Sequence, residues 1–155
     1  MNWNKKEVHM KVSVKKLHED AQIPHFGSQF AAGADLYAYL DGDEHLAIPP
    51  HGTLKIGTGI AVAVPNGYWG GIYARSGLAT KQGLRPANAV GVVDPDYRGE
   101  IIVAIHNDSN VPKIVHHGDR IAQLVITPVP TVTYEVSDEL DSTERGNGGF
   151  GHTGV

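Results

Sequence analysis

Alternating apolar and polar residues run along most of the chain and predict β-strands. From Val8 to Val14 every second residue is apolar and the residues between are polar, the pattern of a strand with one buried face. The same alternation runs from Leu54 to Val64 and ends at the turn-forming sequence 65–67, Pro-Asn-Gly. Further strands are predicted at residues 70–74, 89–93, 101–106, 120–127 and 131–136.

Turn signals separate these segments at nearly regular spacing, which is typical of an all-β sandwich or barrel. One segment, SGLATKQG, has helical character instead. Ser76 is suited to be its N-cap and Gly83 its C-terminal stop, which leaves fewer than two helical turns between them. We therefore expect a β-rich fold with one very short helix.

The composition supports short strands joined by turns, because the 155 residues include 19 glycines and 9 prolines. The length favours a single domain. Residues 1–137 are predicted to form its β-structure, and residues 138–155 to form a linker and a C-terminal arm. The arm is rich in glycine, which loses the most backbone freedom on ordering, so we expect it to be flexible.

Charge and cysteine content exclude several classes of function. With 13 basic and 17 acidic residues the formal net charge is −4, so the sequence lacks the basic character expected for binding nucleic acid or an anionic membrane. There are no cysteines, which excludes disulfides, thiolate zinc sites and cysteine nucleophiles. The first residues lack the apolar run of a signal peptide and no segment approaches a membrane span, so a cytoplasmic protein is expected.

Two segments carry residues suited to phosphate chemistry. Arg75 immediately precedes the predicted helix, where a guanidinium and free backbone N–H groups would both favour phosphate. Asp94 and Asp96 lie in a predicted hairpin-like bend, and a carboxylate at a strand end can orient or deprotonate water. Aspartates beside proline also form ordinary turns. Tyr97 in the same bend is either a packing aromatic or a platform for a sugar.

Other polar residues have equally open interpretations. Asp35 lies at the start of an apolar segment and could hold magnesium through water, or simply form a turn. Arg120 is flanked by apolar residues and indicates a structural ion pair, and Gln123 an interior hydrogen-bonding group. The histidines show no zinc-ligand spacing.

The order of these segments is more specific than any one of them. The sequences AGADL, RSGL, GVVDPDYRGE, GDRIAQ and RGNGGFGHTG follow one another between about residue 23 and the C-terminus. They resemble the five ordered motifs of the homotrimeric dUTP diphosphatase (dUTPase) family. The resemblance implies an all-β, jelly-roll-like distorted β-barrel with one very short helix and a flexible arm. It also implies a homotrimer whose active sites are shared between subunits.

The activity that the resemblance implies is magnesium-assisted hydrolysis of dUTP to dUMP and pyrophosphate. This reaction keeps uracil out of DNA and supplies dUMP for thymidylate synthesis. By the resemblance, Asp94 activates the attacking water, and Asp35 lies near the water shell of a Mg²⁺ ion held mainly by substrate phosphates. The implied uracil and deoxyribose contacts are Asn88, Gly91, Tyr97 and Phe150. The implied phosphate contacts are Arg75, Ser76, Gly77, Gln123, Arg145, Gly151, His152 and Thr153.

The glycine-rich arm then gains a role as a lid. It would order over the nucleotide, stack Phe150 on uracil and exclude bulk water. His152 departs from the family pattern, which usually has serine there, although imidazole can still donate to phosphate.

Two alternative functions are compatible with parts of the sequence. A dCTP deaminase shares the fold but needs a general-base glutamate, for which Glu100 is the candidate; its place in YRGE fits the triphosphatase pattern instead. A nucleotide-responsive regulatory protein would keep the pocket without catalysis, and the intact Asp94 and Arg145 argue against that loss.

Overall fold

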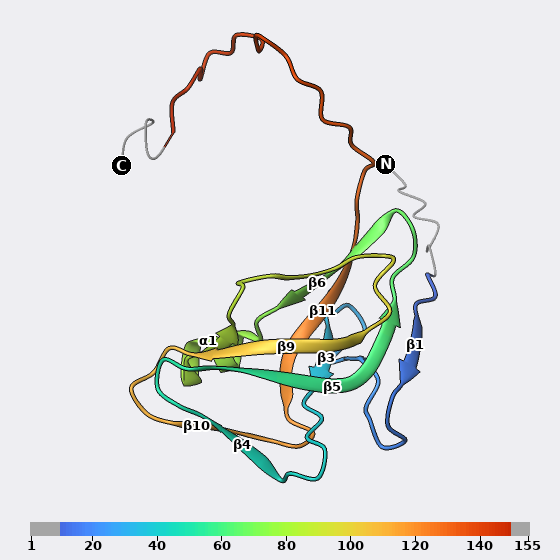
Figure 1. Cartoon of the computed structure of the whole chain (residues 1–155), viewed down its shortest axis with the longest axis vertical. Coiled ribbons are helices and arrows are strands. Elements are labelled where there is room, and N and C mark those ends of the chain that lie inside the picture. Colours follow the sequence, from blue (N-terminus) through green and yellow to red (C-terminus); the bar gives the residue numbers. More distant parts are fainter. Residues whose placement is uncertain (1–9, 150–155) are drawn as a thin grey trace.

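The computed structural model describes residues 10–149, which form three antiparallel sheets and one short helix (Figure 1). The helix is α1 (Ser76–Gln82). The strands are β1 (Ser13–Lys16), β2 (His25–Phe26), β3 (Ala34–Tyr37), β4 (His45–Ile48), β5 (Thr53–Ala63), β6 (Tyr68–Tyr73), β7 (Leu84–Pro86), β8 (Gly91–Val93), β9 (Glu100–Asn107), β10 (Lys113–His116) and β11 (Arg120–Pro128).

Successive strands from β5 to β9 alternate between the two larger sheets. One sheet has the order β1-β5-β9-β7 and the other β2-β3-β11-β6-β8, while β10 and β4 form a separate pair. This winding confirms the all-β, jelly-roll-like prediction and its single short helix. The sheets are open rather than closed into a barrel, since the described strands of each sheet end at two free edges.

The core lies between the inward faces of these sheets and follows the period-two pattern of the sequence. On β9, Ile101, Val103 and Ile105 are buried, whereas Ile102 between them is exposed. Such alternation is expected when one face of an antiparallel strand packs on the core. Residues from the facing sheet complete the core, among them Leu36, Ile72, Ala122 and Leu124.

Most of the long strands lie where the alternation predicts them. The segments 54–64, 70–74, 101–106 and 120–127 correspond to β5, β6, β9 and β11, and 89–93 is shortened to β8. The short strands β2, β3, β4, β7 and β10 have too few residues to show a clear period. The predicted strand 8–14 begins only at Ser13 within the described residues, and 1–9 lie outside them.

The strand predicted at 131–136 is wrong for the single chain. This segment has no strand pairing, and Val132, Tyr134 and Val136 are exposed. Figure 1 shows residues 129–149 running away from the sheets as an extended segment. The alternation is present, but in one chain no neighbouring strand is available to satisfy its backbone hydrogen bonds.

The helix ends as predicted but begins differently. Gly83 adopts φ 69° and its N–H bonds to the Leu78 carbonyl, so it is the expected left-handed stop. Arg75, with extended backbone angles, occupies the N-cap position, and no side chain caps the helix. Ser76 is therefore the first helical residue and not the cap. Within residues 10–149, no helix is long and apolar enough to cross a membrane.

A buried amide at the end of β9 fixes the loop that follows it. Asn107 is fully buried, and its Nδ2 donates to the carbonyls of Ile48, Pro49 and Val111 at 3.1, 3.2 and 2.8 Å. Its Oδ1 accepts hydrogen bonds from the N–H and hydroxyl of Ser109 at 2.9 and 2.7 Å. Because both polar atoms of the Asn107 amide have hydrogen-bond partners, burying this side chain costs little free energy.

We predict that Asn107→Ala lowers the free energy of unfolding by about 2–3 kcal/mol, because it leaves several buried polar groups unpaired. Urea denaturation measures the change. Asn66→Ala is the matched control, since Asn66 is exposed in the turn before β6 and its replacement should change stability by less than about 0.5 kcal/mol. Equal losses from both variants would contradict this assignment.

The exposed Asp108 beside this loop carries a charge-assisted pair. Arg85 donates to its two oxygens at 2.6 and 3.0 Å, and these hydrogen bonds lower the pKa of the Asp108 carboxyl. A carboxyl with a lowered folded-state pKa stabilises the fold above its unfolded pKa of about 3.9. That contribution is lost as the pH falls through the lowered folded-state pKa.

We therefore predict that Asp108→Asn destabilises the protein slightly at pH 6, and that the difference from wild type shrinks at pH 3 and below. The effect is small because the pair is exposed to solvent. Urea unfolding of both proteins across this pH range measures it. A difference that stays constant with pH would show that the charge of Asp108 has no part in it.

Candidate active site

Asp35 is the centre of a cluster that joins three separate parts of the chain. It lies on β3, opposite Gln123 of β11, and is only 5% exposed. Its Oδ1 accepts hydrogen bonds from Arg75 Nε at 3.0 Å and Gln123 Nε2 at 3.3 Å, and its Oδ2 accepts one from Arg120 Nη1 at 3.3 Å. We call these four residues the Asp35 cluster. It brings together residues predicted from the AGADL, RSGL and GDRIAQ motifs.

The Asp35 cluster combines two guanidinium groups with one carboxylate, so its formal charge is positive. Arg75 Nη1 also donates to the Arg120 carbonyl at 3.3 Å, and this second contact further fixes the Arg75 guanidinium group. The side chains of Arg75 and Arg120 are 25% and 53% exposed. Each guanidinium has five N–H donors, so both keep donors that can reach an anion from solvent. The ion pair expected for Arg120 is present, but the sequence did not indicate that Arg120 lies beside Arg75.

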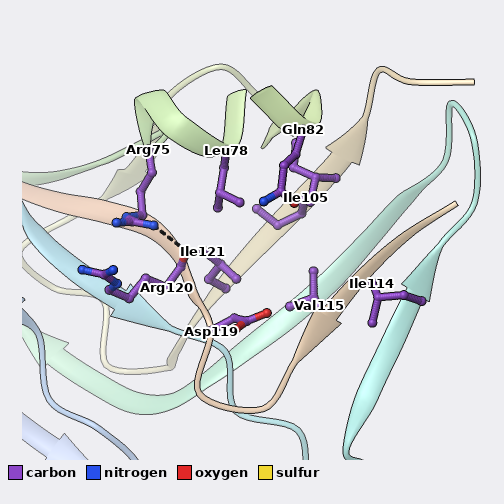
Figure 2. A pocket seen from close by; sticks show the side chains of 10 residues that line it. Arg75, Leu78, Gln82, Ile105, Ile114, Val115, Asp119, Arg120 and Ile121 are labelled. Carbon is purple, nitrogen blue, oxygen red and sulfur yellow. Dashed lines mark hydrogen bonds between the residues drawn. The ribbon is translucent and has the colours of Figure 1, made fainter. Parts of the chain in front are cut away.

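A pocket of about 220 Å³ lies next to the Asp35 cluster, beneath α1. Figure 2 shows Arg75 and Arg120 together at one side of it, with Leu78, Val115 and Ile121 along the lining. At the start of the helix Ser76 and Gly77 are exposed. A side chain at Gly77 would meet open space, so the backbone there is accessible to a ligand.

A second group of predicted residues lies in the turn between β8 and β9, residues 94–99. Asp94 directly follows β8 and is exposed, and its carbonyl accepts a hydrogen bond from the Tyr97 N–H at 3.1 Å. Arg98 Nη1 donates to the carbonyls of Pro95 at 2.6 Å and Tyr97 at 2.9 Å. We call this segment the 94–99 turn. Its backbone is held by local bonds, while the Asp94 carboxylate faces solvent.

The 94–99 turn is not the hairpin bend that the sequence suggested. β8 pairs with β6, whereas β9 pairs with β5 and β7, so the turn crosses from one sheet to the other. The local pattern of two apolar runs around a turn cannot distinguish these arrangements, because both begin and end with a buried strand.

Tyr97 and Glu100 have well-defined partners at the end of this turn. The Tyr97 hydroxyl donates to the Glu100 carbonyl at 2.9 Å, and its side chain remains partly exposed. The Glu100 carboxylate accepts the Gly59 N–H at 2.8 Å. Glu100 therefore serves as a structural acceptor, which does not favour its use as a general base.

The predicted base-reading segment is a tight turn between β7 and β8. Ala89 has a positive φ of 60°, and the Val90 N–H bonds to the Asn88 carbonyl at 2.6 Å. Gly91 begins β8 and is buried opposite Ile72. A Cβ at Gly91 would lie 3.0 Å from Ile72 Cβ, so the glycine permits close packing of β8 on β6. Asn88 itself is exposed.

The Asp35 cluster and the 94–99 turn lie at opposite ends of β9 within one chain. Glu100 follows the turn at the start of β9, whereas Ile105, near its end, lines the pocket beside Arg75. Five residues of extended strand span about 17 Å. Figure 1 shows the same separation, with α1 beside the tip of β9 and the turn at its other end. One chain therefore does not bring Asp94 and Tyr97 to the arginines.

The predicted arm residues are only partly within the described structure. Arg145 lies on the extended segment, and its Nε donates to the Gly148 carbonyl at 2.8 Å. It makes no hydrogen bond to the sheets in the described part of the chain. Phe150, Gly151, His152 and Thr153 lie outside the described residues.

No group of three or more histidines, aspartates or glutamates suited to holding a metal ion occurs within residues 10–149. Mg²⁺ commonly keeps several waters and takes only one or two protein carboxylates, with phosphates among its remaining ligands. Asp35 is a single carboxylate whose two oxygens already accept hydrogen bonds from Arg75, Gln123 and Arg120, so it fits the outer part of a metal site better than direct coordination.

Comparison with known proteins gives a consistent result across the chain. The dUTPase family model matches residues 19–154. The deoxyuridine 5'-triphosphate nucleotidohydrolase of Syntrophotalea carbinolica is 47% identical over 143 residues, covering 92% of this chain and 96% of that protein. The protein of the same name from Desulfitobacterium hafniense is 46% identical over 149 residues, covering 96% of this chain and 97% of that protein.

Solved structures agree with the sequence relatives. A mutant dUTPase of Staphylococcus bacteriophage 80alpha with dUpNHpp has a TM-score of 0.84 at 28% identity, covering 94% of this chain and 99% of that chain. A mutant dUTPase from phage phi11 of S. aureus, described for its coordination of a structural Mg(II) ion, has a TM-score of 0.76 at 25% identity, covering 86% and 100%. Since sequence, fold and motif order all point the same way, the chain belongs to the dUTPase family.

Proposed function

We propose that the chain hydrolyses dUTP to dUMP and pyrophosphate, keeping uracil out of DNA and supplying dUMP for thymidylate synthesis. The observation that carries this proposal is the Asp35 cluster. In it Arg75 and Arg120 are held side by side on one buried carboxylate, beside an accessible helix start. A preorganised pair of guanidinium groups is suited to a polyphosphate. The family match and the relatives' name support dUTP as the substrate.

In the proposed reaction Asp94 accepts a proton from one water while the water oxygen attacks the α-phosphorus. The bond from that phosphorus to the oxygen that bridges to the β-phosphorus breaks in line, and pyrophosphate leaves. The exposed carboxylate at the end of β8, on a turn fixed by backbone hydrogen bonds, supports this role. Arg75 stabilises the charge that develops on the phosphate oxygens, with Ser76, Gly77 and Gln123 as further phosphate contacts.

Magnesium is the proposed cofactor, held mainly by substrate phosphates with Asp35 near its water shell. The ion would supply neutralisation of phosphate charge. Both Asp35 oxygens already accept hydrogen bonds within the Asp35 cluster, which supports a place outside direct ligation.

The proposed base and sugar site consists of the 88–91 backbone, Tyr97 and Phe150. A tight turn can deny space to the 5-methyl group of thymine, and Tyr97 against the sugar would exclude a 2′-hydroxyl. Cytosine would leave donors and acceptors of this backbone unpaired, which discriminates strongly. The positive φ of Ala89 and the close packing at Gly91 support a turn of fixed shape.

We further propose a homotrimer in which each site takes residues from more than one subunit. The separation of the 94–99 turn from the Asp35 cluster along β9 supports this, because the reaction requires both groups at one substrate. Arg145, Phe150, Gly151, His152 and Thr153 would close over the nucleotide as a lid from the C-terminal arm. We propose a cytoplasmic location, and the net charge of −4 supports neither nucleic acid nor membrane as a partner.

We predict that the protein with Mg²⁺ releases dUMP and pyrophosphate from dUTP but leaves dCTP, dTTP and UTP unchanged. Chromatographic product analysis measures this. Asp94→Asn should lower kcat by about 10²–10⁴-fold, because the general base is lost. Asp43→Asn, an exposed aspartate outside the site, is the control. Deoxyuridine products from dCTP would indicate a deaminase, and dUTP binding without turnover a regulatory protein.

A mixing experiment tests whether sites are shared. We predict that Asp94→Asn and Arg75→Ala chains, each inactive alone, regain activity when coexpressed. In a random equal mixture about one site in four combines an intact Asp94 with an intact Arg75 from different chains. No recovery in purified mixed assemblies would place both residues of each site in one subunit.

We also predict that Phe150→Ala raises KM for dUTP and lowers kcat while the free energy of unfolding stays unchanged, because the ring would contact only the bound base. Steady-state kinetics and urea denaturation provide the two readouts. Val155→Ala in the same arm is the control. Unaltered kinetics for Phe150→Ala would remove this residue from the site.

A further inference from the structure

The 94–99 turn is joined to the core through a bulge in β5. Opposite Ile101 of β9, β5 contains the three residues 58–60, because Gly57 pairs with Ile102 and Ala61 with Glu100. This extra length bends β5 and turns the Gly59 N–H toward Glu100. The Thr58 hydroxyl donates to the Ile101 carbonyl at 2.6 Å and closes the bulge from the buried side.

Glycine is required both at Gly59, inside the bulge, and at Gly57, just before it, for different reasons. Gly59 has φ +67°, a left-handed conformation in which other residues are strained. Gly57 gives room to the carboxylate, since a Cβ there would lie 2.5 Å from Glu100 Oε1. The two glycines therefore form a recess into which the Glu100 carboxylate fits, with the Gly59 N–H as its donor at 2.8 Å.

A continuous set of hydrogen bonds leads from this recess to Asp94. Glu100 is fixed through its carboxylate, and its carbonyl accepts the Tyr97 hydroxyl at 2.9 Å. The Tyr97 N–H in turn donates to the Asp94 carbonyl at 3.1 Å. The first two of these bonds use the side chains of Glu100 and Tyr97, and the third joins backbone to backbone, so the position of Glu100 restrains that of the turn.

We propose that Glu100 is a positioning residue, seated in the Gly57–Gly59 recess, that sets the placement of Tyr97 and Asp94. The role requires a hydrogen-bond acceptor at Oε1 and does not require a negative charge or proton transfer. Its kinetic consequences rest on the proposed function, whereas its structural consequences do not. Glu100 is also the residue that a deaminase would use as its general base. As a hydrogen-bond acceptor for the Gly59 N–H it instead has a structural role.

Three variants separate positioning from chemistry. Glu100→Gln keeps an oxygen acceptor for the Gly59 N–H and should retain most of the activity and the wild-type pH profile. Glu100→Ala removes the acceptor and should lower kcat about 10- to 100-fold, the scale expected when a catalytic group is displaced by about 1 Å. Gly57→Ala leaves Glu100 in the sequence but pushes its carboxylate out of the recess, and should reproduce the loss.

The double variant Gly57→Ala/Glu100→Ala should lose no more activity than Glu100→Ala alone, because both changes remove the same hydrogen bond. Binding of inorganic pyrophosphate, which depends on the Asp35 cluster at the other end of β9, should be unchanged in every variant. Glu19→Ala, an exposed glutamate away from the turn, is the matched control. A loss of pyrophosphate binding equal to the loss of kcat would indicate general misfolding and overturn the proposal.

Hydrogen exchange gives a readout that does not need turnover. The Tyr97 amide should lose protection in Glu100→Ala and Gly57→Ala, and keep it in Glu100→Gln. If the wild type hydrolyses no dUTP, the proposed function fails, but this exchange pattern still tests the positioning role. If Glu100→Gln is as inactive as Glu100→Ala while the Tyr97 amide stays protected from exchange, the carboxylate itself is the reacting group and the proposal fails. Full activity in Glu100→Ala would show that the turn needs no anchor.

Discussion

The buried carboxylate of Asp35 is the constraint that holds Arg75 and Arg120 together at one end of the molecule. Strand β3, strand β11 and the residue before α1 meet at this one group, which neutralises part of the charge of two neighbouring arginines. Without it, Arg75 and Arg120 would repel one another and turn toward solvent. One buried carboxylate thus fixes two guanidinium groups beside each other, the arrangement on which the proposed phosphate binding depends.

The position of the 94–99 turn depends on how the chain passes between the sheets. Because strands β5 to β9 alternate between the two larger sheets, the 94–99 turn joins two layers of the core. A crossing turn of this kind is fixed at both ends by buried strands, so the exposed Asp94 has a rigid support although it lies on the surface. The bulge of β5 adds a third point of attachment through Glu100.

Much of this could be predicted from the sequence, and the failures have physical causes. The long strands and the Gly83 helix stop follow from local periodicity and backbone preference. The strands of two to four residues are too short to show a period, and the partners of β8 and β9 depend on contacts distant in sequence. The segment 131–136 alternates like a strand but finds no partner within one chain. The role of Arg120 beside Arg75 required the register of β11 on β3.

The extended segment 129–149 is also exposed to proteolysis. Its described residues lie almost entirely on the surface, so proteases have ready access to the backbone there. A single cut between residue 129 and Arg145 would detach Arg145 and everything after it, while every core strand from β1 to β11 stayed intact. A clipped chain would therefore persist as a folded protein, and under the proposed function it would lack the lid while keeping its fold.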